Sequence, residues 1–247
     1  MKWRTTYLPA GVLLALAVSA CDSTGTDRQP IGISFSTMAP PAPIVAGTES
    51  GSLSITVTGG GSTLIVTRAQ LVLHELELKL STSSTCAEDT VEDSCESIEL
   101  GPMLIELPVT DVVMTPIAAT VPSGTYHEIE FDIRRPGTDP ADVAFVAANP
   151  NFNNVSIRLE GTFNGAPFVF TSELDQEVQI DFDPPLVITE ANNNVTIAVD
   201  IRSWFTNSNG TLVSPATANP GQPNASIVSE RIKVSLRAFE DDDKDGS

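Results

Sequence analysis

The chain has 247 residues, of which 41% are hydrophobic, and it carries a formal net charge of −19 at pH 7. That apolar content is sufficient for one sizeable hydrophobic core. A surface this acidic repels nucleic acid and anionic lipid, so the composition argues against a nucleic-acid-binding role.

Residues 1–20 have the composition of a bacterial export signal. Lys2 and Arg4 form a basic start, and the apolar run that follows ends in Ser19, Ala20 and Cys21. This run is shorter than the about 20 apolar residues that a membrane-spanning helix needs. The small residues before the cysteine resemble the lipobox of bacterial lipoproteins. We therefore predict that Cys21 is acylated and holds the protein on a lipid bilayer of the cell envelope, inner or outer. An ordinary signal peptide that ends beside a cysteine is the alternative.

The mature chain is predicted to begin with a flexible tether and to continue as a β domain. Residues 21–50 are rich in Ser, Thr, Gly and Pro, and only residues 31–35 alternate well enough for a short strand. Over residues 51–223, apolar and polar residues alternate, and turn signals recur at intervals of about 8–12 residues. This period predicts an all-β fold, an antiparallel β-sandwich.

Within the sandwich, two segments give sharper expectations. The alternation over residues 64–80 puts His74 on one apolar face with Val72, Leu76, Leu78 and Leu80, which is typical of a hydrogen-bonded core or rim histidine. Asn164 and Gly165 form the strongest hairpin signal in the chain. Residues 137–150 contain Pro and Asp and are predicted to be irregular.

The two cysteines that remain after Cys21 lie close together. Cys86 and Cys95 bracket an acidic loop, and in an oxidising compartment such a pair is expected to form a disulfide. Closing a loop of this length would stabilise the fold by about 2.5–3 kcal/mol. A thiolate metal site is disfavoured because it needs more ligands than these two.

The C-terminal segment changes period. Over residues 224–240, apolar residues recur at spacings of three and four, which predicts one amphipathic helix with Asn224 as its N-cap and with Trp204 and Phe205 packed beneath it. Residues 241–247 form an acidic tail. Asp241, Asp243 and Asp245, followed by Gly246, match the opening of a calcium-binding loop. The acid expected at loop position 12 is missing from the sequence, so a solvated tail is favoured over a calcium site.

Residues 66–135 resemble DUF4382, an uncharacterised family of bacterial lipoproteins. The resemblance is carried by residues 69–78 (AQLVLHELEL), 105–108 (IELP) and 121–131 (VPSGTYHEIEF). It implies a small transthyretin-like (prealbumin-like) β-sandwich and brings no established activity. The Cys86–Cys95 loop and the long C-terminal half depart from the family pattern.

Few residues point to chemistry. His74 and His127 are the only two histidines, and the zinc motif H-E-x-x-H is absent, which disfavours a zinc site. Tyr126 is predicted to be a corner tyrosine that hydrogen-bonds backbone. We predict no catalytic residue and no cofactor. The favoured function is a non-enzymatic binding or structural module with a protein or glycan partner. A carboxylate-dependent envelope hydrolase and a calcium-dependent adhesion module are the alternatives.

Overall fold

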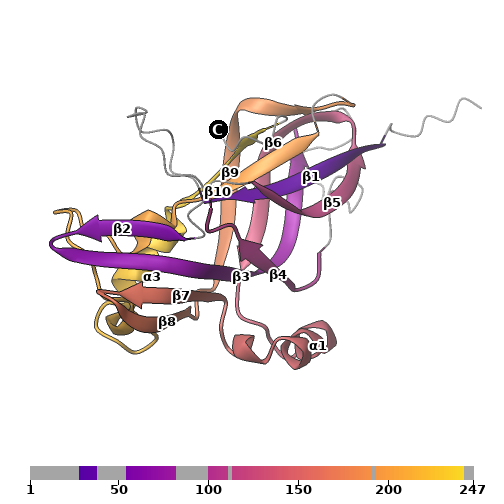
Figure 1. Cartoon of the computed structure of the whole chain (residues 1–247). Coiled ribbons are helices and arrows are strands. Elements are labelled where there is room, and N and C mark those ends of the chain that lie inside the picture. Colours follow the sequence, from indigo (N-terminus) through magenta and orange to yellow (C-terminus); the bar gives the residue numbers. More distant parts are fainter. Residues whose placement is uncertain (1–27, 38–53, 82–99, 111–112, 191–192, 242–247) are drawn as a thin grey trace, which may run out of the picture.

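The structure is a computed structural model that describes residues 28–37, 54–81, 100–110, 113–190 and 193–241. Its strands form two sheets around one main core (Figure 1). Sheet A contains, in spatial order, β11 (Leu236–Glu240), β10 (Asn194–Val199), β1 (Arg28–Ser36) and β5 (Met114–Pro122). Sheet B contains β8 (Ala166–Ser172), β7 (Ile157–Phe163), β3 (Ser62–Leu80), β6 (Gly124–Ile133) and β9 (Gln176–Ile188). Two short strands, β2 (Ile55–Gly59) and β4 (Met103–Leu107), also pair with β3.

The predicted all-β sandwich is confirmed, with one difference in strand direction. β1 and β10 are parallel, whereas the other strand pairs of the described residues are antiparallel. Alternate side chains of the strands fill the main core, as a period of two requires. Ile33 of β1 and Ile129 of β6, for example, are both fully buried.

The short strand expected over residues 31–35 is confirmed, but it extends over Arg28–Ser36, so the predicted tether is wrong for this stretch. These residues form β1, which lies between β10 and β5 in the middle of sheet A. Ile31, Ile33 and Phe35 are at most 2% exposed. Burial of these three side chains outweighs the Gly- and Pro-rich composition that favoured a tether. Residues 38–50 lie outside the described residues.

The predicted common face of the long strand is also wrong, because β3 changes faces at a β-bulge. The register with β6 shifts between His74 and Leu76, and Glu75 between them has a φ of 44°. Before the bulge, Val72 packs in a small separate cluster. After the bulge, the next even-numbered residues join the main core. The core side of β3 therefore comprises Leu71 and Leu73 before the bulge, and Leu76 and Leu78 after it.

The hairpin predicted at Asn164 and Gly165 is confirmed. The two residues have φ values of 52° and 80° and connect β7 to β8, with Phe163 paired to Ala166. The Asn164 side chain also accepts a hydrogen bond from the Thr63 backbone N–H at 2.8 Å. This contact fixes the hairpin to the neighbouring turn.

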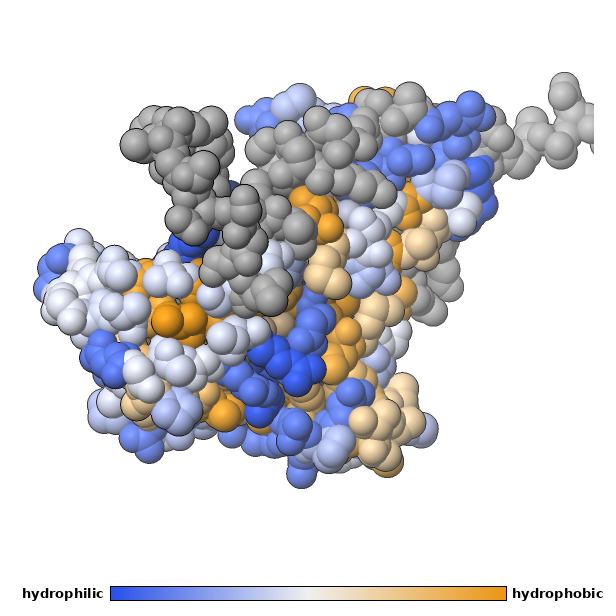
Figure 2. Space-filling view, in the orientation of Figure 1, coloured by the Kyte–Doolittle hydropathy of each residue, from blue (hydrophilic) through white to orange (hydrophobic). Residues whose placement is uncertain are grey.

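A helix replaces the irregular structure predicted for residues 137–150. α1 (Pro140–Ala148) begins after Asp139, whose carboxylate accepts a hydrogen bond from the Asp142 N–H at 3.0 Å. Phe145 packs against Phe152 of the short turn η1 (Pro150–Phe152) and covers Val72. Most of the outward side chains of α1 are Ala or Val, and apolar surface is visible at the lower right of the molecule, where α1 lies (Figures 1 and 2).

The predicted C-terminal helix is confirmed over only part of its length. α3 (Ala225–Lys233) is helical, but residues 236–240 form β11 and pair with β10. These residues form a strand rather than a helix because their pairing with β10 completes the edge of sheet A. Asn224 occupies the N-cap position, but its side chain donates to Thr217 rather than to the helix. Trp204, at the end of α2 (Ile201–Trp204), lies under α3 as predicted and donates to Ser235 at 2.7 Å.

Candidate functional site

A cleft of about 380 Å³ lies between α3 and the end of β8 with the residues that follow it. Residues 171–175 form one wall. The other wall is the face of α3 that carries Ala225, Ser229 and Lys233, spaced four residues apart as one face of a helix requires. Ala218, Pro220 and Gly221 complete the lining. The volume is in the range of about 300–1,000 Å³ that is typical of small-molecule sites.

The first wall is fixed to the turn region before α3 by Asn219. The Asn219 side-chain oxygen accepts a hydrogen bond from the Thr171 N–H at 2.8 Å, and its amide nitrogen donates to the Val169 carbonyl at 3.4 Å. This side chain therefore pairs with the outer edge of β8 as a neighbouring strand would. The segment is continuous with η2 (Pro215–Thr217) on one side and α3 on the other.

Glu173 of the cleft is held in place by two neighbouring side chains. One carboxylate oxygen accepts a hydrogen bond from the Asn154 amide at 2.9 Å, and the other lies 3.6 Å from the Arg135 guanidinium. The side chain is still 42% exposed, so it can meet a ligand. Asp175 adds a second carboxylate to the same wall.

The opposite wall carries a cation. Val228 and Ile232 are buried on the core side of α3, which turns Ser229 and Lys233 towards the cleft. The Lys233 ammonium lies 2.9 Å from the exposed Glu230 carboxylate, one turn earlier on the helix. Because exposed pairs of this kind contribute at most about 1 kcal/mol, the ammonium can exchange this partner for a ligand at little cost.

His74 does not lie at the cleft but beneath α1, where it is buried as predicted for a core histidine. Its Nε2 atom departs from the prediction, because it makes no hydrogen bond within the part of the chain that the structure describes. Its Nε2 atom is 3.7 Å from Asp142 Oδ1, and neither atom has a hydrogen-bond partner among the described residues. The other oxygen of Asp142 accepts from the Gly137 N–H at 2.6 Å and lies 3.3 Å from the Arg134 guanidinium. Burial, followed by the Arg134 charge, lowers the pKa of His74, although Asp142, Asp139 and Glu75 act in the opposite direction.

His127 is exposed at the other end of sheet B, on a strand whose outer face is acidic. Glu128, Glu130 and Asp132 of this face pair in register with Asp181, Gln179 and Glu177 of β9. The Lys79 ammonium contacts Glu128 at 3.1 Å and also contacts Glu130. A hydrogen bond with Glu130 raises the pKa of Glu177. In the part of the chain that the structure describes, no three His, Cys, Asp or Glu side chains are grouped to hold a metal ion.

Tyr126 is confirmed as a corner tyrosine. Its hydroxyl donates to the Pro122 carbonyl at 2.7 Å, four residues upstream, across the turn from β5 to β6. Burial raises the pKa of the phenol to about 12.

Asp241, the first residue of the predicted solvated tail, is buried instead. Its carboxylate accepts from the Thr196 hydroxyl at 2.7 Å, and its carbonyl accepts from the Asn194 amide at 2.9 Å. These contacts extend β11 by one residue along β10 and engage an oxygen that a calcium loop would use. Asp243 and Asp245 lie outside the described residues.

The predicted lipidation and disulfide sites also lie outside the described residues. This applies to Cys21, Cys86 and Cys95, which therefore remain predictions. Among the helices described, none has the length and apolar character needed to span a membrane.

No family model matches the sequence, and no curated protein matches it. Among solved structures, the chain is similar to MbnP from Methylosinus trichosporium, with 12% sequence identity, a TM-score of 0.40, and coverage of 82% of this chain and 87% of that chain. A likeness at this level carries no argument about what this chain binds.

Proposed function

We propose that this chain is an envelope lipoprotein whose β-sandwich is a non-enzymatic binding module, with its cleft directed away from the bilayer. The observation that carries the proposal is the position of β1. Arg28, the first residue of β1, follows Cys21 by seven residues, a distance that even a fully extended chain cannot stretch beyond about 25 Å. An acyl anchor at Cys21 would therefore hold the Arg28 end of the sandwich close to the membrane.

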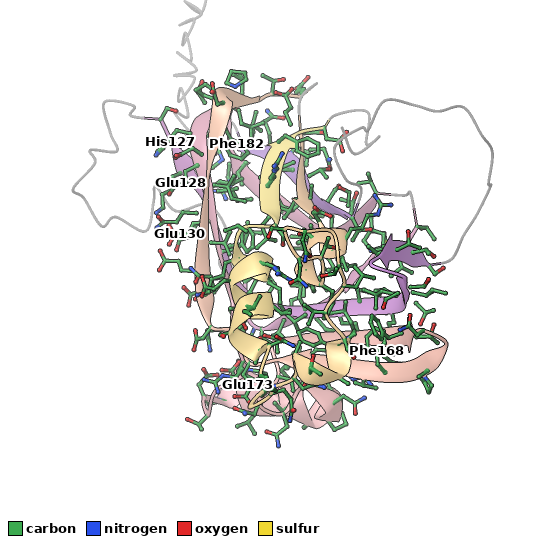
Figure 3. All side chains as sticks on the ribbon, turned by 90° about the vertical axis from the view of Figure 1, so that its left-hand side faces the viewer. His127, Glu128, Glu130, Phe168, Glu173 and Phe182 are labelled. Carbon is green, nitrogen blue, oxygen red and sulfur yellow. The ribbon has the colours of Figure 1, made fainter. Side chains whose placement is uncertain are left out.

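The strand register supports the orientation of the cleft. Arg28 pairs with Pro122, and Gly124 directly beyond that turn pairs with Ile188 at the end of β9. β9 begins at Gln176, 12 residues earlier in the strand and next to the cleft residue Asp175. At about 3.3 Å per residue, the two ends of β9 lie up to about 40 Å apart. Figure 3 agrees, since His127 and Phe182 lie towards one end of the molecule and Glu173 towards the other.

The proposal includes a relationship to the DUF4382 lipoproteins. The segment that resembles DUF4382 lipoproteins, residues 66–135, contributes most of β3 and all of β4, β5 and β6. These strands include two of the central strands of sheet B. The confirmed corner contact of Tyr126 lies within a motif that carries the resemblance.

Binding is favoured over hydrolysis by the contacts of Glu173. A carboxylate-dependent hydrolase would use Glu173 and Asp175, the two acids of the cleft, and one of them would have to carry and release a proton in each turnover. Both oxygens of Glu173 already face donors, Asn154 and Arg135. Such contacts suit a fixed anionic anchor better than a proton donor.

The anchor is tested on the full chain, expressed with its own export signal in a Gram-negative host and extracted from membranes in a non-ionic detergent. Mass spectrometry of the N-terminal peptide is expected to show Cys21 as the first residue, carrying acyl chains. The Cys21→Ser variant is expected to lose both the acyl mass and the membrane association. A mature protein that begins at Met1, or an unmodified Cys21, would overturn the proposal.

A further inference from the structure

We infer that the cleft takes a small zwitterion of the short-peptide class, which places its ammonium group at Glu173 and Asp175 and its carboxylate at Lys233. The inference rests on the proposed binding function and gives it a ligand class. It follows from the opposite charges of the two walls and from the dimensions of the cleft.

The anionic wall is built to meet a cation. Arg135 and Asn154 hold Glu173 in place, so little side-chain freedom is lost when a ligand binds. Two carboxylates in one wall favour an ammonium group over a neutral donor, because hydrogen bonds between charged groups are about twice as strong as neutral ones.

The opposite wall is suited to an anion. Lys233 is the cation among the residues that line the cleft, and its present partner, Glu230, is 71% exposed. A ligand carboxylate would replace this exposed contact with one inside the cleft. Thr171, Ser172 and Ser229 add hydroxyl groups, which can hydrogen-bond the peptide groups of a ligand.

The length of the helical wall indicates the size of the ligand. From Ala225 to Lys233, α3 rises by about 12 Å at 1.5 Å per residue. An extended peptide covers about 3.3 Å per residue, so this wall is as long as two or three peptide residues.

The test uses the full-length protein in a non-ionic detergent and isothermal titration calorimetry with trialanine. Three forms are compared: trialanine with free termini, the N-acetylated form, which lacks the ammonium group, and the C-terminal amide, which lacks the carboxylate. We expect the free form to bind, and each blocked form to bind about tenfold more weakly or worse.

Variants assign each terminus to its wall. Lys233→Met is expected to weaken binding of free trialanine about tenfold while leaving the amide form unchanged. Glu173→Gln is expected to weaken the free form and leave the N-acetylated form unchanged. Arg237→Met and Glu190→Gln, at exposed positions outside the cleft, serve as matched controls. Thermal melts of all variants verify that each is folded.

Equal affinity for the three forms, or no binding of free trialanine at millimolar concentration, would overturn the ligand class. Unchanged affinity in both cleft variants would show that the peptide binds elsewhere and would overturn it equally. Acylation of Cys21 is measured independently by mass spectrometry, so failure of this inference is distinguishable from failure of the anchor.

Discussion

Asn219 is expected to be the side chain that holds the cleft together. Asn219→Ala removes the acceptor of the Thr171 N–H at 2.8 Å and two weaker contacts at 3.4 Å, to the Thr171 hydroxyl and the Val169 carbonyl. One good hydrogen bond contributes about 1 kcal/mol, so the total loss should be about 1–2 kcal/mol. For a domain of this size, that lowers the melting temperature by about 2–8 °C.

Two measurements check this reasoning. Thermal melts give the change in stability, and hydrogen exchange reports the Thr171 amide, which should exchange faster in Asn219→Ala. Asn219→Asp is the matched control, since it keeps an acceptor for Thr171 and loses only the donor to Val169. Its destabilisation should be smaller. If Asn219→Ala melts within 1 °C of the parent and Thr171 exchanges at the same rate, Asn219 does not pair with β8 in solution.

Two further predictions concern the sandwich itself. A Cβ at Gly161 would lie 1.9 Å from the Ile65 carbonyl oxygen, so Gly161→Ala should destabilise the fold by about 1–3 kcal/mol or more, whereas Gly101→Ala, which meets nothing within 4 Å, should be neutral in chemical denaturation. The pKa of His74 is lowered in the folded state. As the pH falls, the unfolded state therefore binds a proton at His74 before the folded state does. The stability linked to His74 is therefore complete above its unfolded pKa of about 6.5 and is lost as the pH falls below that value. Denaturation at pH 7.5 and 5.5 should show a larger loss for the parent than for His74→Gln, and equal losses would contradict the assignment.

Local patterns were sufficient to predict most of the strands and one turn. Alternation identifies a strand wherever one side of it faces a core, as for Ile129 and Phe131 of β6. Asn164 and Gly165 tolerate positive φ, so their dipeptide specifies its hairpin without help from the rest of the chain. These signals depend on a few neighbouring residues, which is why the sequence alone carries them.

α1 could not be predicted, because its polarity is reversed. A surface helix normally turns its polar residues outward. In α1 the one polar residue, Asp142, is fully buried beside Arg134, while Val143 is 57% exposed. The bulge at Glu75 was equally hidden, since glutamate has no preference for a positive φ. The cleft could not be predicted either, because distant segments of the chain build it. Its walls come from residues 171–175 and 218–233, which no local pattern joins, and Asn219 connects them through hydrogen bonds to residues about 50 positions earlier.

The position of β1 also determines how a pulling force at the proposed anchor would act on the sandwich. A pull on Cys21 reaches the sandwich through Arg28, at the start of a strand with a hydrogen-bonded neighbour on each side. Force directed along β1 shears both ladders together, so many hydrogen bonds share the load and the strand does not peel off one bond at a time. β1 is also tied to its neighbours by side chains, because the Ser34 hydroxyl contacts Thr115 at 2.7 Å and Asn194 at 2.8 Å. A chain anchored at an edge strand would lack this second ladder, and thus a central N-terminal strand suits a domain held at the membrane by a short connection.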